Sequence, residues 1–284
     1  MAVPFLIPAV AFLVLFVYFP AALSLVLGFF NYQLAGSPTW AGLSNFHAAL
    51  TYNVFWIAVK NTFYYAVLMI PTTLAGSILI ALLLHHHSRL FAAVRTMVLL
   101  PYITPVIATS IGWLWMFDPQ YGVLNAILGV LHIPPSNWLL SPAAAMPSVA
   151  LYSLWHGLGF NVVIVLSALA NIPTSVLEAA AIDGATSWHK FWKVTLPLLS
   201  PVIFFLAIVT TLATLQAFSQ VYALSSGQGG PSYATTTLLL LIYQTAFQYF
   251  HFSYAAAMAI LLVLMILILT LIQGALAKRW VFYQ

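Results

Sequence analysis

The chain is a succession of long apolar segments separated by short polar connections. Each segment approaches or exceeds the roughly 20 residues that an α-helix needs to cross a hydrocarbon core about 30 Å thick. Six spans are predicted, at residues 5–29, 56–84, 95–117, 144–170, 199–223 and 253–277. The apolar–polar alternation of membrane β-strands is absent, so helices must satisfy the backbone in lipid. The pattern predicts an all-α membrane protein with one transmembrane domain over residues 1–284.

Composition excludes a soluble fold. The chain is 64% hydrophobic and 4% charged, with a mean hydropathy of +1.06. Its seven basic and three acidic residues could not cover the surface of a soluble protein of 284 residues. The basic residues are scattered and form no patch for nucleic acid. The absence of cysteine excludes disulfides, thiolate metal sites and cysteine nucleophiles.

The basic residues predict the orientation of the chain. Six of the seven fall on one face of a six-span arrangement: Arg89, Arg95, Lys190, Lys193, Lys278 and Arg279. Lys60 alone falls on the other face. Because basic residues concentrate on the inner side of membranes, both termini are predicted to be cytoplasmic. The N-terminal apolar run lacks a basic leader and is interpreted as a first span rather than a cleaved signal peptide.

Residues 173–198 form a polar island between the fourth and fifth predicted spans, on the cytoplasmic side. Two of the three acidic residues of the chain, Glu178 and Asp183, lie in it. The residues alone leave two interpretations open. The island can be a surface that docks another protein, or an amphipathic loop at the membrane interface in which Glu178 only caps a helix.

The island is predicted to contain a helix, a glycine and a second helix. Ser175 stands three residues before Glu178, the spacing of a capping box, which predicts a helix over residues 176–182. Gly184 can adopt the left-handed conformation that ends many helices. This element is therefore predicted to lie on the cytoplasmic surface as a helix–Gly–helix unit.

The second helix of the unit is predicted to be amphipathic. Thr186 or Ser187 can cap its start. Trp188, Phe191 and Trp192 share one face at helical spacing, which is typical of a helix that packs its aromatic side against an apolar surface.

The spacing within the island resembles the EAA loop of the permease subunits of bacterial ABC importers. Glu178-Ala179-Ala180 is followed after three residues by Gly184, after nine more by Val194, and then by Leu196-Pro197. Valine in place of isoleucine is the one departure from that pattern. Further segments recur in carbohydrate-type permeases, among them Gly42–Phe46, Trp115–Pro119 and Gly229–Pro231. The C-terminal Tyr283-Gln284 is similar to glycerol-3-phosphate permeases.

The resemblance implies a permease subunit in a bacterial cytoplasmic (inner) membrane. Its cargo would be a sugar, an oligosaccharide or a glycerol-phosphate. It would assemble, within membrane lipid, with a second related permease as a heterodimer, two ATPase subunits and an extracytoplasmic solute-binding protein. The residues that would couple to the ATPase are Glu178, Ala179, Ala180, Asp183, Gly184 and Pro197. The aromatic face of the second helix would pack back on the spans. ATP and Mg would bind the ATPase, and this chain would hold no cofactor.

Polar and aromatic side chains at membrane depth mark a candidate passage, because polar groups are costly in lipid. Clustering in the fourth and fifth spans, together with similarity to maltose-type permeases, selects the following residues: His156, Gly157, Phe160, Asn161, Thr210, Thr214, Gln216 and Ala217. Two other roles stay open for them. A threonine can bond to its own helix, and the other polar side chains can bond between helices.

The chain does not carry the elements of an enzyme that hydrolyses ATP. It has no G-x-x-x-x-G-K-[ST] phosphate loop, so another chain must supply ATP hydrolysis. An ion-coupled secondary transporter is the alternative, but it would need ionisable groups at membrane depth, where only His156 is predicted. No metal site is predicted, because the adjacent residues of His85-His86-His87 diverge by about 100° on a helix.

Overall fold

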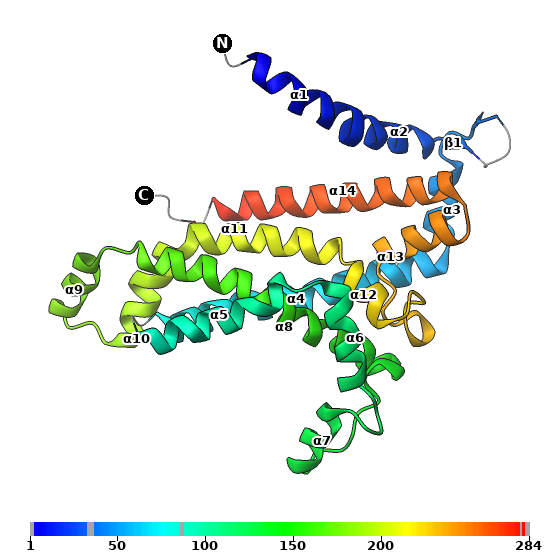
Figure 1. The fold of residues 1–284 in the computed structure, drawn as a ribbon. Helices are drawn as coiled ribbons and strands as arrows, with labels where there is room; N and C mark the ends of the chain where they lie inside the picture. The colour runs from blue at the N-terminus through cyan, green and yellow to red at the C-terminus, as the bar shows by residue number, and fades with distance from the viewer. Residues whose placement is uncertain (1–2, 33–36, 86–87, 279, 282–284) are drawn as a thin grey trace.

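The computed structural model describes residues 3–32, 37–85, 88–278 and 280–281. The expectations that rest on His86, His87, Arg279, Tyr283 and Gln284 lie outside these residues. The described chain is an elongated bundle of helices with one two-stranded hairpin (Figure 1). The predicted all-α membrane fold is confirmed.

Five helical segments of the described chain are long and apolar enough to cross a membrane. The first is continuous through α1 (Val3–Leu13), the π-helical η1 (Val14–Tyr18) and α2 (Phe19–Leu27); the others are α4 (Asn53–Leu84), α8 (Pro142–Ala170), α11 (Leu196–Leu215) with the turns before it, and α14 (Phe252–Ala277). The bent helix pair α5 and α6 gives the six spans predicted when it is counted as one span.

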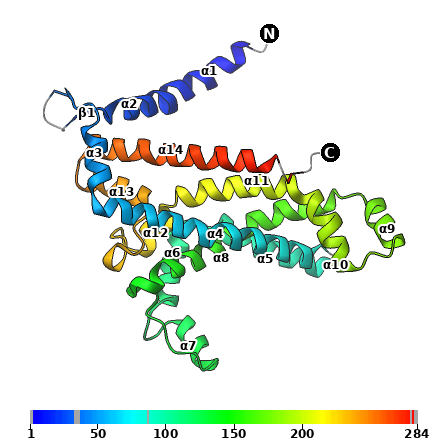
Figure 2. The ribbon, with the colours of Figure 1, turned by 180° about the vertical axis from the view of Figure 1, so that it is seen from behind.

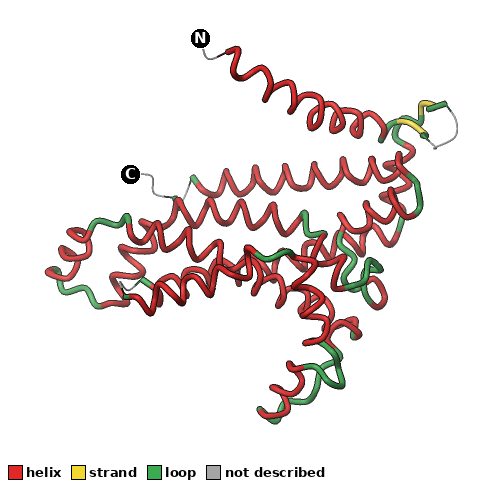
Figure 3. Tube along the Cα trace, viewed as in Figure 1, coloured by secondary structure: helices red, strands yellow, loops and turns green. Residues whose placement is uncertain are grey.

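The third span, predicted over 95–117, is bent into two helices. α5 covers Arg89–Ile103 and α6 covers Val106–Met116, and the two are bent by 100°. Pro105 has no N–H to donate, and the residue before a proline is disfavoured in helical conformation. Thr104 accordingly adopts φ −85° and ψ 147°. The bend directs α6 away from the bundle axis (Figure 3).

The fifth span also departs from its predicted limits of 199–223. α10 (Ser187–Lys190), the π-helical η3 (Phe191–Thr195) and α11 form one continuous helical stretch of 29 residues, Ser187–Leu215. The helix then ends at Leu215, eight residues before the predicted limit. The chain bends through Phe218, with φ −132° and ψ −64°, into the short helix α12 (Ser219–Leu224).

Shorter elements fill the connections. They are β1 (Phe30–Asn31) paired antiparallel with β2 (Thr39–Trp40), α3 (Ser44–Thr51), α7 (Val123–Val130), the 3₁₀ turns η2 (Trp138–Leu140) and η4 (Pro231–Tyr233), α9 (Thr174–Ile182), and α13 (Leu238–Tyr243) continued by the π-helical η5 (Gln244–Gln248). The apolar stretch Leu238–Gln248 lacks the length to span a membrane.

One of the three buried hydrophobic clusters lies where α4, α5, α8 and α11 pack together. Gly159 of α8 faces the backbone of α5 so closely that an added Cβ would lie 2.2 Å from the carbonyl oxygen of Val98. A glycine is therefore required at this crossing. Arg95 of α5 donates to the Leu84 carbonyl at the end of α4, with Nη2 at 2.6 Å, and joins these two helices at one end of the bundle.

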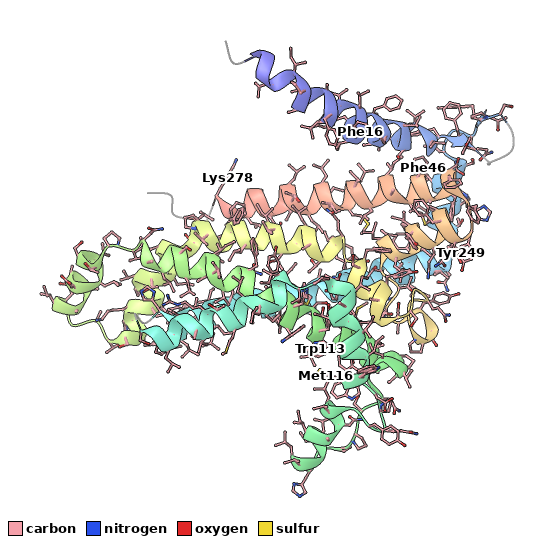
Figure 4. The ribbon with its side chains drawn as sticks, in the orientation of Figure 1. Phe16, Phe46, Trp113, Met116, Tyr249 and Lys278 are labelled. Carbon is pink, nitrogen blue, oxygen red and sulfur yellow. The ribbon has the colours of Figure 1, made fainter. Side chains whose placement is uncertain are left out.

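The two ends of the bundle differ in content. Figures 1 and 2 show α9 and α10 at one end, together with the connection from α4 to α5, whereas α3, α12 and α13 lie at the other end. Both described chain ends lie toward the α9 end, and Figure 4 shows Lys278 there at the end of α14. We refer to these as the α9 end and the α3 end.

The first apolar segment stands off from the rest of the bundle (Figure 1). None of its residues over Leu6–Leu27 is buried in the described chain. Phe16, for example, is 67% exposed. The contact with the bundle is made near Gly28, where an added Cβ would lie 2.7 Å from the Ile260 side chain of α14.

Candidate functional site

The helix–Gly–helix unit begins two residues earlier than predicted. α9 starts at Thr174, after Pro173 in an extended conformation, and no described side chain caps it. The capping box expected from Ser175 and Glu178 is therefore not formed. The ring of Pro173 fixes φ at −61° and lacks an N–H, so the helix starts directly after it. Glu178 lies in the middle of α9 and is exposed to solvent.

The end of α9 is closed by backbone hydrogen bonds around Gly184. Gly184 has φ +78°, which confirms the predicted left-handed conformation. The Ala185 N–H donates to the Ala180 carbonyl and the Gly184 N–H donates to the Ala181 carbonyl, each at 3.0 Å. These two bonds define a Schellman motif, which turns the chain sharply at a residue that tolerates positive φ.

The second helix starts as predicted at Thr186, whose Oγ1 accepts a hydrogen bond from the His189 N–H at 3.4 Å. Trp188 and Trp192 lie on the face that turns toward α4, with ring centroids 5.6 Å apart. The expected close packing of this face on the spans is not present. An apolar groove of about 550 Å³ separates it from Ile78 and Leu82 of α4, and Trp188 stays 68% exposed.

The predicted coupling residues are mostly close together and accessible. Glu178, Ala179, Asp183 and Gly184 are exposed, and Ala180 is half-buried. Pro197 is separate from them: it lies in the first turn of α11, where its carbonyl accepts the Ser200 hydroxyl at 2.6 Å. The turn also exposes an apolar side chain that sequence reasoning did not select, Ile182, which is 87% exposed.

A cavity of about 240 Å³ lies between α4, α5, α6, α8, α11 and α12. Six of the eight predicted passage residues line it: His156, Gly157, Phe160, Asn161, Thr210 and Thr214. Gln216 and Ala217 do not, because the helix ends before them. Gln216 is exposed, and Ala217 is 1% exposed with its carbonyl accepting the Thr237 hydroxyl at 2.9 Å.

Residues that were not selected as passage residues complete the lining. Tyr65 and Thr73 come from α4 and Tyr102 from α5. Gln220 of α12 also lines the cavity, and its Nε2 donates to the Tyr65 hydroxyl at 3.3 Å. Tyr65, Met69 and Thr73 follow one another at i, i+4 and i+8, so a helical projection of α4 could have placed them on one face.

The cavity wall includes the broken backbone of the third span. The Tyr152 hydroxyl donates to the Val106 carbonyl at 2.9 Å and lies 2.7 Å from Thr109 Oγ1. Nε2 of His156 lies 3.2 Å from the Thr104 carbonyl oxygen. His156 thus gives a partner to the Thr104 carbonyl, which lies in the break between the two helices, as required at membrane depth. The Val106 carbonyl also accepts the Ser110 hydroxyl of its own helix at 2.7 Å. His156 and Tyr152 thus hold α8 against the bend.

The described residues contain no group of three or more His, Cys, Asp or Glu side chains that could hold a metal ion. The charged residues of the coupling unit and the neutral residues of the cavity are also far apart in the bundle. The arrangement therefore offers a surface for docking at one end and a polar cavity within the helices.

Residues 72–282 match the family of binding-protein-dependent transport system inner membrane components. This match covers well over half of the chain, and the chain belongs to this family. The resemblance to permease subunits of carbohydrate-type ABC importers is confirmed. The chain is accordingly a permease subunit of an importer, a multi-pass inner-membrane protein and not an enzyme. Family membership therefore favours an importer subunit over the alternative, an ion-coupled secondary transporter.

Individual relatives agree with the family. The chain is 35% identical over 284 residues to the probable ABC transporter permease protein YesP of Bacillus subtilis, covering 99% of this chain and 90% of YesP. It is 35% identical over 247 residues to the lactose transport system permease protein LacF of Rhizobium radiobacter, covering 86% of this chain and 83% of LacF.

The fold is also similar to a solved structure. A chain of the bacterial alginate ABC transporter in complex with an alginate pentasaccharide-bound periplasmic protein superposes with a TM-score of 0.85 at 24% identity. The superposition covers 97% of this chain and 93% of that one. This similarity supports the helix arrangement described above.

Proposed function

We propose that this chain forms part of the passage for a neutral carbohydrate and is driven by a separate ATPase that docks on the unit α9–Gly184–α10. The observation that carries the cargo class is the lining of the cavity. It contains hydroxyl, amide and aromatic groups, and none of the described residues around it is Lys, Arg, Asp or Glu. A phosphate would require basic partners, so the lining favours neutral sugars over glycerol-phosphate.

Aromatic rings add to this assignment. Tyr102 and Phe160 stack with centroids 5.0 Å apart and an interplanar angle of 23°, and both line the cavity. Apolar ring faces beside a few polar groups are typical of sites that orient small polar ligands. The names of LacF and of the alginate transporter refer to carbohydrate cargo, which supports the same class.

The docking role is supported by the geometry of the unit. A short helix closed by a Schellman motif presents Glu178 and Ala179 to solvent, and Ile182 leaves 87% of its surface uncovered. The helix α10, which contains Lys190, lies at the same end of the bundle as α9, and Figure 4 shows Lys278 toward this end. These basic residues support a cytoplasmic location. ATP and Mg would bind the partner ATPase.

The helix that follows the docking unit supplies a mechanical connection. The stretch Ser187–Leu215 is helical without a break, and its residues Thr210 and Thr214 line the cavity. A displacement of α10 by the ATPase would therefore shift the cavity wall. Movement of this helix against α4 and α8 would alternate access to the cavity between the two sides of the membrane.

Two further partners fit surfaces that this chain leaves incomplete. Tyr102 lines the cavity but is 43% exposed, and the segment Leu6–Leu27 is uncovered. A second permease subunit, forming a heterodimer, would close the cavity beside Tyr102 and cover the segment Leu6–Leu27.

At the α3 end, a depression of about 640 Å³ beside Asp118 and Gln228 would receive the solute-binding protein on the outer side.

Reconstitution tests this function. The permease pair, the ATPase and the binding protein would be placed in proteoliposomes with ATP inside and labelled sugars outside. We expect uptake that requires the ATPase chain and that vanadate abolishes. Uptake by this chain alone, driven by an ion gradient, would contradict the proposal.

A further inference from the structure

Two buried polar atoms of the cavity have no hydrogen-bond partner in the described chain: Oγ1 of Thr73 and Oδ1 of Asn161. Both residues line the same cavity, Thr73 from α4 and Asn161 from α8. Their side chains are 3% and 7% exposed. Buried polar atoms are nearly always paired, so an unpaired one calls for a partner outside the chain. Two of them around one cavity point to a ligand.

Thr73 differs from the threonines near it on the same helix. Thr62 donates to the Ala58 carbonyl at 2.8 Å, and Thr72 donates to the carbonyls of Leu68 and Met69. These are the usual bonds of a threonine to its own helix. Thr73 makes no such bond, and its hydroxyl keeps both its donor and its acceptor capacity for a group in the cavity.

The unpaired atom of Asn161 is an acceptor. Its Nδ2 donates to the Gly157 carbonyl at 3.1 Å, which fixes the amide. The remaining Oδ1 can accept a hydrogen bond but cannot donate one. A hydroxyl group can donate to it, whereas an ionised carboxylate or phosphate cannot. The pair therefore suits a compound that carries several neutral hydroxyl groups.

The pair lies on one side of the cavity. α4 and α8 both run toward the α9 end (Figure 1). Thr73 lies eight residues beyond Tyr65 on α4, which is about 12 Å along the helix. Asn161 lies five residues beyond His156 on α8. Both are thus on the side of the cavity nearer the coupling unit.

We propose that Thr73 and Asn161 form a hydroxyl-recognition subsite in the inner part of the cavity, which selects neutral polyhydroxylated cargo. The subsite rests on the proposed passage function and deepens it. A cargo hydroxyl donates to Asn161 Oδ1, and a second hydroxyl exchanges a hydrogen bond with Thr73. Cargo that lacks the matching hydroxyl leaves these atoms unpaired, and it is transported less well.

The test uses the complete importer in proteoliposomes and a panel of labelled glucose, galactose, lactose, maltose and trehalose. For a transported sugar, Thr73→Val and Asn161→Leu are each expected to lower kcat/KM about tenfold. Singly deoxygenated analogues of that sugar give the decisive readout. The wild type is expected to discriminate against one of them, and the matching variant to lose that discrimination.

Thr72→Val is the matched control, because the Thr72 hydroxyl bonds only to its own helix. It should leave uptake unchanged. Co-purification with the ATPase establishes that each variant assembles, and Asn161→Gln provides a variant that keeps the acceptor if Asn161→Leu fails to assemble.

The outcomes separate the two proposals. Sugar uptake by the wild type with unchanged kinetics and unchanged discrimination in both variants would overturn the subsite, and the two atoms would then bond only water. Absence of uptake for every sugar of the panel would instead remove the carbohydrate assignment, and the subsite with it.

Discussion

The coupling unit and the passage cavity are built in opposite ways. The unit is held by bonds between near neighbours: Ala185 to Ala180 across the turn and His189 to Thr186 at the next helix start. The cavity is held by bonds between distant segments, such as Gln220 to Tyr65. Local bonds survive when whole helices move, whereas bonds between helices do not.

This difference suits each region to the mechanical role proposed for it. A unit that keeps its shape can transmit a displacement from a docked partner. A cavity whose walls come from six helices changes shape when one of them shifts. The third span is bent by 100° between α5 and α6. Tyr152 and His156 hold it to α8 by hydrogen bonds between distant segments.

The largest effect is expected from charge changes in the unit. Gly184→Asp places a side chain at φ +78° and, like Glu178→Lys, alters the charge of the docking surface. Either should abolish co-purification of the ATPase while membrane insertion stays intact. The control is Gly129→Asp at an open, exposed position of α7. Normal co-purification with both coupling variants would contradict the docking role.

A smaller effect is expected at the crossing of α5 and α8. Gly159→Ala would place a methyl group 2.2 Å from the Val98 carbonyl oxygen and should destabilise the fold by about 1–3 kcal/mol. A thermal unfolding scan in detergent measures this as a lower Tm. Gly112→Ala, where an added Cβ meets nothing within 4 Å, is the control. Equal Tm values for the two variants would refute the close packing.

Tyr152→Phe should loosen the bend of the third span without affecting the unit. It removes the bond to Val106 and the contact with Thr109, together worth about 1 kcal/mol. We expect slower sugar uptake with normal ATPase co-purification. Tyr121→Phe, at a side chain that is 89% exposed, is the control. Loss of co-purification in Tyr152→Phe would contradict the separation of the two regions.

The smallest effect is expected at Ser175, since no capping box is formed at the start of α9. Ser175→Ala should leave ATPase binding and Tm unchanged. Thr186→Ala removes a cap that is present and should cost about 1 kcal/mol of helix stability. Thermal unfolding measures both effects. An equal loss of stability in the two variants would show that Ser175 does cap α9 and would contradict this prediction.

The sequence indicated the local features more completely than the distant ones. Gly184 and Thr186 act on the backbone within five residues, and both were placed correctly. Pro105 was also a visible signal for a break, but the hydropathy of the third span continues across it and concealed the bend. Turns and helix ends that depend on one or two residues can therefore be predicted from the sequence, except where hydropathy averaged over a whole span hides them.

The remaining errors come from tertiary contacts. No glycine or proline marks the end of α11 at Leu215, and Ala217 is buried through a bond from Thr237, twenty residues away. Thr72 and Thr73 are indistinguishable by type, yet only Thr73 lines the cavity. The direction of a side chain in a bundle depends on neighbouring helices, which a single helix does not specify.

Photo-cross-linking tests most directly that the unit α9–Gly184–α10 docks the ATPase. The chain has no cysteine, so Ala179→Cys carries a single benzophenone maleimide in the assembled importer, and Gln120→Cys carries it at the opposite end. We predict that illumination cross-links the ATPase to position 179 and not to position 120. Capture of the ATPase from position 120, or from neither position, would contradict it.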